Sequence, residues 1–183
     1  NLHAKGVMIL AAYLGSFYAA DKPLSMAASI VFEQNYGEID GDSATVAELC
    51  ALLSSIARIP LKQSIAITGS MNQFGQVQAI GGVNEKIEGF YDVCCLVGMT
   101  GTQGVIIPRS NMQHLMLKPE VRQSVENGLF HIYAVDDISD AINVLSEYEA
   151  GEADEQGNYP ENSFNGAVAA RLANWAELHK HDK

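Results

Sequence analysis

Hydrophobic positions along the chain follow two spacings, one typical of helices and one typical of strands. Apolar residues recur every three or four positions within residues 4–20, 44–57, 83–99, 119–128, 136–149 and 165–180, and this spacing predicts helices. Short apolar, β-branched runs at 23–34, 64–68, 76–80, 104–108 and 129–135 predict strands. Because strands alternate with helices, the pattern predicts an α/β domain.

Turn and breaker residues divide these elements. Asn72 to Gly75 separates SIAIT from QVQAI, and this predicts a hairpin between those two strands. Residues 35–42 form a loop rich in turn residues, and Pro60 ends the helix that follows it. The polar segment 150–163 is typical of a linker. We therefore expect a main domain over 1–148, with a linker and a last amphipathic helix over 149–183.

Composition narrows the class of protein. The chain has 183 residues, 48% of them hydrophobic and 18% charged, which suits one globular domain with a substantial core. Its net charge of −11 and pI near 4.7 argue against nucleic acid or an anionic membrane as a partner, since both bind basic surfaces. The sequence contains no phosphate loop of the type G-x-x-x-x-G-K-[ST], so we expect no ATP binding by that route.

Cysteine and histidine usage predicts neither disulfides nor metal. Three cysteines without a C-x-x-C pair fit a reducing cytosol, and the five histidines are scattered. We expect Cys94 and Cys95 in the core, and Leu172, Trp175 and Leu178 to dock the last helix. The opening apolar run resembles a signal peptide, but its tyrosines and short length favour a buried helix. The missing initial Met suggests a piece of a longer protein.

Ser43 lies at the corner where the loop DGDSA meets an apolar helix. Ser and Asp are favoured at helix N-caps, where their oxygens accept free backbone N–H groups. The same position also suits a nucleophile, because backbone N–H groups at a helix N-terminus can stabilise an oxyanion. No Ser-His-Asp order surrounds Ser43, so a nucleophilic serine would need another base, for which a lysine is the usual alternative.

Lys86 is the candidate base, in the first turn of the helix that follows Gly81 and Gly82. A lysine acting as a base must be neutral, although its usual pKa is about 10.4, and a helix N-terminus and burial both favour the neutral amine. The alternative is a solvated surface lysine paired with Glu85 or Glu88.

Three ordered motifs resolve these alternatives. DGDSA at 40–44, AITGS at 66–70 and GGVNEKIEGF at 81–90 resemble the proteolytic domain of the Lon proteases, closest to the branch with an acidic residue directly before the serine. The resemblance covers roughly residues 5–145. It implies the Lon proteolytic fold, an α/β (α+β) architecture like that of ribosomal protein S5 domain 2, which RNA-binding and kinase domains share.

The resemblance also implies roles for individual residues. Ser43 matches the nucleophile and Lys86 the general base of a Ser-Lys dyad, with Thr68 beside the lysine. Gly41 matches the glycine of the family's serine loop. Gly81 and Gly82 match the glycine pair that precedes the dyad lysine.

Two positions depart from the better-known pattern of the family. Asp42 stands where many members have proline, and Ser70 stands where many have glutamate. A carboxylate beside the dyad would keep the amine protonated. We therefore expect Asp42 to pair with Lys86 in a resting state.

The implied function is that of a serine endopeptidase, the proteolytic part of an ATP-dependent Lon-like protease that degrades unfolded or regulatory proteins. Its ATP and Mg²⁺ would belong to an ATPase module outside this chain, which itself needs no cofactor or metal. The family implies a hexameric ring in the cytoplasm, with protein or peptide substrates and neither nucleic acid nor membrane as a partner. The alternative is a catalytically silent Lon-like domain that serves as an assembly or binding module.

Overall fold

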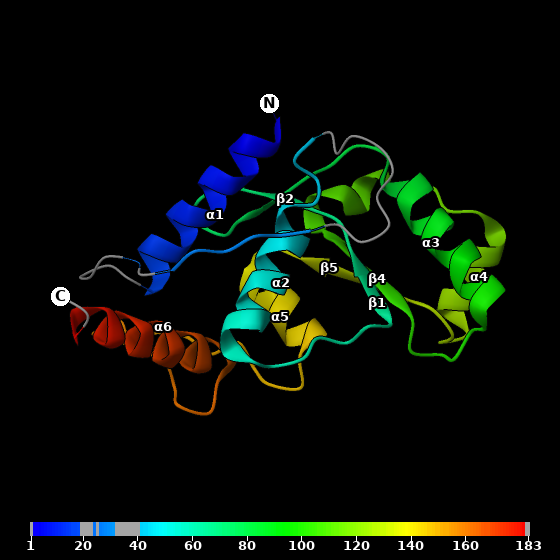
Figure 1. Cartoon of the computed structure of the whole chain (residues 1–183). Coiled ribbons are helices and arrows are strands. Elements are labelled where there is room, and N and C mark those ends of the chain that lie inside the picture. Colours follow the sequence, from blue (N-terminus) through cyan, green and yellow to red (C-terminus); the bar gives the residue numbers. More distant parts are fainter. Residues whose placement is uncertain (1, 19–23, 25, 32–40, 182–183) are drawn as a thin grey trace.

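Three layers make up the chain, with a parallel sheet between two sets of helices (Figure 1). The computed structural model describes residues 2–18, 24, 26–31 and 41–181. The elements in chain order are α1 Leu2–Tyr18, α2 Thr45–Ala57, β1 Ile65–Ile67, β2 Ser70–Met71, β3 Val77–Gln78, α3 Val83–Val97, β4 Gly104–Pro108, the 3₁₀ helix η1 Arg109–His114, α4 Pro119–Glu126, β5 His131–Val135, α5 Ile138–Leu145 and α6 Phe164–His181. The predicted α/β class is confirmed.

The central strand β4 lies between β1 and β5 and runs parallel to both. All five of its residues are buried, as its uninterrupted apolar sequence predicts for a parallel strand covered on both faces. The strand starts at Gly104, where a Cβ atom would lie 2.6 Å from the carbonyl oxygen of His131 on β5. Only glycine allows β4 and β5 to approach so closely at that point.

Alternate residues of β4 point into two separate cores. Val105 and Ile107 pack with residues of α3 and α4, whereas Ile106 packs with residues of α2, α5, α1 and α6. Figure 1 shows the same division, with α3 and α4 on one side of the sheet and α2 and α5 on the other. The alternation follows from the period of two in a strand, and helices α2 and α3 therefore pack on opposite faces of the sheet.

The predicted hairpin exists, but the prediction of its first strand is wrong. SIAIT forms β1, which pairs with β4 instead of with QVQAI. The hairpin joins β2 to β3 across the turn at Asn72 to Gly75. The backbone N–H of Thr68 still donates to Ile106 on β4 at 3.0 Å, so the chain leaves the parallel sheet only at Gly69.

The apolar run at 23–34 was expected to form a strand, and this is wrong for the residues described there. Residues 24 and 26–31 have no regular secondary structure, and no strand pairs with them among the described residues. Residues 26–31 instead line, with α2 and Trp175, a cavity of about 410 Å³. The rest of this run, the end of the first predicted helix and most of the loop at 35–42 lie outside the described residues.

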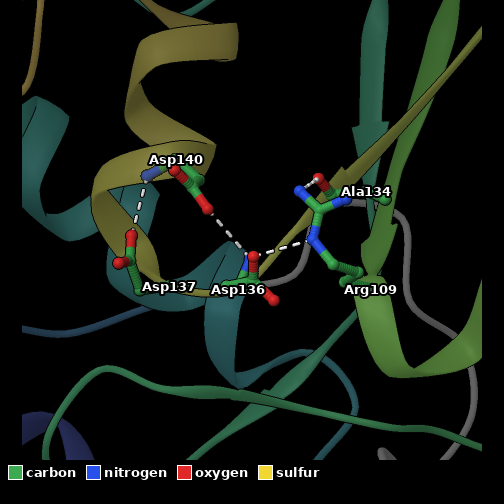
Figure 2. A network of polar contacts seen from close by, with 5 residues as sticks. All are labelled: Arg109, Ala134, Asp136, Asp137 and Asp140. Carbon is green, nitrogen blue, oxygen red and sulfur yellow. Dashed lines mark hydrogen bonds and ion pairs between the residues drawn. The ribbon is translucent and has the colours of Figure 1, made fainter.

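A polar network fixes the start of α5, as Figure 2 shows. Asp137 caps the helix by accepting from the backbone N–H of Asp140 at 2.9 Å, which confirms the predicted acidic start. Asp136 accepts from Arg109 Nε at 2.7 Å, and Arg109 also donates to the carbonyl of Ala134 at 2.9 Å. The carbonyl of Asp136 accepts from Val77 N–H at 2.8 Å, so the same corner holds the β2–β3 hairpin.

Helix α6 packs against α2 and completes the same core. Phe164 and Val168 are fully buried and Leu172 nearly so, while Trp175 packs at the edge of the core. Leu178 is 57% exposed, so the expectation that it docks the helix is wrong. The expectation that Cys94 and Cys95 both lie in the core is confirmed for Cys94, which is buried, and wrong for Cys95, which is exposed.

The described part of the chain contains neither a membrane-spanning helix nor a cluster of metal-binding side chains. No helix there is long and apolar enough to cross a membrane. Among the same residues, no group of three or more His, Cys, Asp or Glu side chains could hold a metal ion.

Candidate functional site

Ser43, Thr68 and Lys86 come together at one point, although they belong to different elements. Lys86 Nζ lies 3.0 Å from Ser43 Oγ and 3.4 Å from Thr68 Oγ1, and the amine donates to both hydroxyls. Ser43 precedes α2, Thr68 follows β1, and Lys86 lies on α3. The structure thus brings together the three polar side chains that the sequence motifs singled out.

The Ser43 hydroxyl does not cap α2. The N-cap residue of α2 is Ala44, and it makes no side-chain capping hydrogen bond. The backbone carbonyl of Asp42 takes that place by accepting from Thr45 N–H at 3.1 Å and from Thr45 Oγ1 at 2.6 Å. The Ser43 side chain is therefore free of a capping role and faces Lys86.

Backbone hydrogen bonds through Gly69 fix the position of Ser43 relative to β1. Gly69 N–H donates to the Ser43 carbonyl at 2.8 Å, and the Gly69 carbonyl accepts from Val46 N–H at 3.2 Å. A Cβ atom at Gly69 would lie 3.1 Å from Val46 Cγ2 and 3.3 Å from Val77 Cγ1, closer than most side chains pack. A glycine here therefore lets the serine loop dock directly on the chain beside Thr68.

Lys86 reaches the site from the first turn of α3. Its backbone N–H donates to the Gly82 carbonyl at 3.0 Å, and Gly82 has a φ of +67°, a left-handed conformation that favours glycine. Gly41 in the serine loop has a φ of +86° for the same reason, whereas nothing in the structure requires a glycine at Gly81. Lys86 is exposed, so the expectation that apolar burial surrounds it is wrong.

Asp42 has a partner other than the one expected. Its carboxylate Oδ2 lies 3.0 Å from Lys5 Nζ on α1, while the Lys86 amine faces the two hydroxyls. The expected pairing of Asp42 with Lys86 is thus not the arrangement in this structure. The hydrogen bond from Lys5 holds the pKa of Asp42 below its ordinary value, against a smaller effect of burial. Ser70, the other departure from the family pattern, is buried on β2.

Comparison with known proteins places this constellation in a family. Residues 34–147 match the model of the Lon protease (S16) C-terminal proteolytic domain. The chain belongs to the Lon protease family. The motifs around Ser43, Thr68 and Lys86 all lie within the matched residues, whereas α1 and α6 lie outside them.

Individual Lon relatives agree with the family model. A Lon protease homolog of Escherichia coli (strain K12) is 54% identical over 145 residues, which cover 79% of this chain and 25% of the relative. A Lon protease homolog of Haemophilus influenzae is 52% identical over the same length, covering 79% and 24%. An archaeal Lon protease of Methanocaldococcus jannaschii is 52% identical over 83 residues, covering 45% and 12%. This chain thus spans about a quarter of the length of the two bacterial relatives.

Sequence reasoning missed two residues that shape this Lon-family site. Lys5 is separated from Asp42 by 37 positions, and no local pattern points from one to the other. Gly69 stands inside the motif AITGS, where a glycine next to the motif threonine was a signal that the backbone packs closely there.

The ion pair between Lys5 and Asp42 gives a prediction about stability. Because the folded-state pKa of Asp42 is lowered, the pair stabilises the fold above the unfolded-state value, about 3.9, and the effect disappears as the pH falls through the folded-state value. The side chains are 60% and 30% exposed, so Asp42→Asn should lower the free energy of unfolding by less than about 1 kcal/mol at pH 7.

Urea unfolding at pH 7 and pH 3 measures this effect. Glu147→Gln, which removes the carboxylate from the exposed pair with Lys62, is the control. A loss for Asp42→Asn that is as large at pH 3 as at pH 7 would contradict the ionic origin of the stabilisation.

Proposed function

We propose that this chain is a serine endopeptidase domain in which Ser43 is the nucleophile and Lys86 is the general base. The observation that carries the proposal is the 3.0 Å contact between Lys86 Nζ and Ser43 Oγ, with Thr68 Oγ1 on the same amine at 3.4 Å. This distance is within the hydrogen-bond range that direct proton transfer needs. Membership of the Lon protease family supports the same assignment.

The proposed reaction proceeds in two halves. When the amine is unprotonated, its lone pair accepts the Ser43 proton as Oγ attacks the peptide carbonyl and forms a tetrahedral intermediate. The intermediate collapses, the C–N bond breaks, and Lys86 returns the proton to the leaving amine, which leaves an ester on Ser43. Water then attacks the ester with Lys86 as the base and releases the carboxylic acid and the free hydroxyl.

Thr68 orients the amine in this scheme. It is nearly buried, and its backbone is held in the sheet by the bond to Ile106, so its hydroxyl is a fixed contact for Lys86 Nζ. A lysine side chain has many rotamers, and a second fixed oxygen beside Ser43 reduces the number that fit. The expected result is a base held in one place before substrate arrives.

The start of α2 supplies the groups that would stabilise the oxyanion. The backbone N–H groups of Ser43 and Ala44 donate no hydrogen bond to any described residue, and both lie at the N-terminal end of the helix. The positive end of the helix dipole favours negative charge there. One such donor typically contributes about 3 kcal/mol to transition-state stabilisation.

The setting of the domain belongs to the same proposal. Because the chain spans about a quarter of its bacterial Lon relatives, we assign ATP-dependent unfolding of substrates to regions outside it. We further propose unfolded or regulatory proteins as substrates, a hexameric ring as the working assembly and the cytoplasm as its location. The described residues need neither ATP nor a metal for the peptide hydrolysis derived above.

Hydrolysis of unfolded casein and of a short fluorogenic peptide tests the proposal. The chain should cleave both, and a fluorophosphonate probe should label Ser43. Ser43→Ala should abolish cleavage and labelling, whereas Ser55→Ala, which changes an exposed serine on α2, should leave both unchanged. Equal hydrolysis by the wild type and by Ser43→Ala would refute the nucleophile, and an inactive, unlabelled wild-type chain would favour the silent-module alternative.

A further inference from the structure

The ion pair between α1 and the serine loop lies directly beside the proposed dyad. Lys5 Nζ contacts Asp42 Oδ2 at 3.0 Å, and Asp42 is the residue immediately before Ser43. We propose that Lys5 is a positioning residue, which holds the Asp42 carboxylate away from Lys86. The Lys86 amine then remains able to accept the Ser43 proton, so this inference rests on the function proposed above.

Chain geometry keeps Asp42 close to the dyad in any rotamer. Neighbouring Cα atoms are about 3.8 Å apart, and the backbone of Asp42 is fixed by the two bonds from Thr45 to its carbonyl. Only the direction of the side chain is therefore free to change. A carboxylate turned toward Lys86 would favour the protonated amine, which cannot act as a base.

Lys5 is the described cation that pairs with this carboxylate. Its reach depends on the close approach of α1 to α2, where Gly6 faces Glu48 and Thr45: a Cβ atom at Gly6 would lie 3.5 Å from Glu48 Oε2 and 3.8 Å from Thr45 Oγ1. Gly6, which follows Lys5 on α1, thus lies close to the first turn of α2, just after Asp42 in the sequence. The ammonium group of Lys5 neutralises the charge that would otherwise act on the dyad.

Other charged groups near the dyad must be considered for any pH effect. Glu48 on α2 is buried and has an interaction partner, and Glu85 is exposed on α3 beside Lys86. Glu88 on the same helix is paired with Lys118. The pair between Glu88 and Lys118 involves neither Lys5 nor Asp42. A double-variant cycle on Lys5 and Asp42 separates the effect of their ion pair from that of the other charged groups.

The pH profile of kcat/KM for the fluorogenic peptide tests the positioning role. Lys5→Met should move the acidic limb of the profile upward by about one pH unit, which corresponds to about a tenfold loss of activity on that limb. Lys5→Arg keeps the ion pair and should keep the wild-type profile. In an Asp42→Asn background, Lys5→Met should cause no further shift.

The matched control is Lys62→Met, which changes the net charge equally and removes the exposed pair with Glu147. It should leave the profile unchanged. A Lys5→Met profile that coincides with that of Lys62→Met would overturn the inference. So would the same shift in the presence and absence of Asp42, or a uniform loss at every pH that accompanies a lower melting temperature. Failure of the proposed function gives a different result, namely hydrolysis that persists in Ser43→Ala.

Discussion

Replacing Lys86 with methionine is expected to lower kcat/KM for peptide hydrolysis by about 10³-fold, the usual contribution of a general acid–base group. Methionine keeps most of the aliphatic stem but removes the amine that lies 3.0 Å from Ser43 Oγ. The serine would then lack a proton acceptor, while the peptide could still bind and the backbone N–H groups of α2 would remain. Because Lys86 is exposed, its loss should change the free energy of unfolding little.

Steady-state hydrolysis of the fluorogenic peptide across pH measures the Lys86→Met effect. Lys118→Met is the matched control, since it removes a lysine that pairs with Glu88 on the same helix without contacting Ser43 or Thr68. The control should retain wild-type kcat/KM. Activity of Lys86→Met within tenfold of the wild type would show that another group accepts the serine proton.

Replacing Phe164 with alanine is expected to lower the free energy of unfolding by about 3–5 kcal/mol, the range for a buried phenylalanine. Phe164 starts α6, is fully buried, and packs in the same core as α2. The backbone N–H of Phe164 donates to the carbonyl of Glu149 at 2.8 Å, and this bond fixes the start of α6. The neighbouring side chains therefore cannot fill the cavity left by the phenyl ring unless the start of α6 moves. A large cavity penalty should therefore remain.

Chemical denaturation followed by circular dichroism measures the Phe164→Ala effect. Leu178→Ala removes a large apolar side chain from the exposed part of the same helix and should change the unfolding free energy by less than about 0.5 kcal/mol. A Phe164→Ala value as small as that of Leu178→Ala would mean that α6 contributes nothing to the stability of the main core. The predicted boundary at residue 149 would then separate two parts of the chain that do not stabilise each other.

Most of the fold could be predicted from hydrophobic spacing because both faces of the sheet are covered. GVIIP is buried along its whole length, and a strand that is apolar at every position is typical of that environment. Helix α2 was predicted over 44–57 and is found over Thr45–Ala57, where Pro60 follows the end of the helix as expected. These signals are local, so they can be read from the sequence without knowing which distant segments pack together.

Strand pairing could not be predicted in the same way, because it depends on distant residues. SIAIT and QVQAI are close in sequence and flank a strong turn, yet β1, which SIAIT forms, pairs with β4. The hairpin forms anyway, from the shorter segment that begins at Ser70. The run at 23–34 shows the reverse case: its described residues, 24 and 26–31, are mostly apolar but form no strand, and no described strand pairs with them.

The sequence motifs located the candidate site, but they did not predict the ion pair beside it. Three ordered motifs placed Ser43, Thr68 and Lys86 together, and the structure brings their side chains within hydrogen-bond distance. Nothing local to Asp42 indicates that Lys5, in the first helix, would be its partner. An ion pair between separate helices is set by their packing, which periodicity alone does not describe.

The hydrogen bond from Thr68 N–H to the Ile106 carbonyl has a consequence for the order of events during synthesis. Ser43, Thr68 and Lys86 are all translated before β4, whose strand fixes the threonine in the sheet. A growing chain therefore carries every reactive group of the dyad before it has the frame that aligns them. Under the proposed function, peptide cleavage should begin only after β4 has paired with β1.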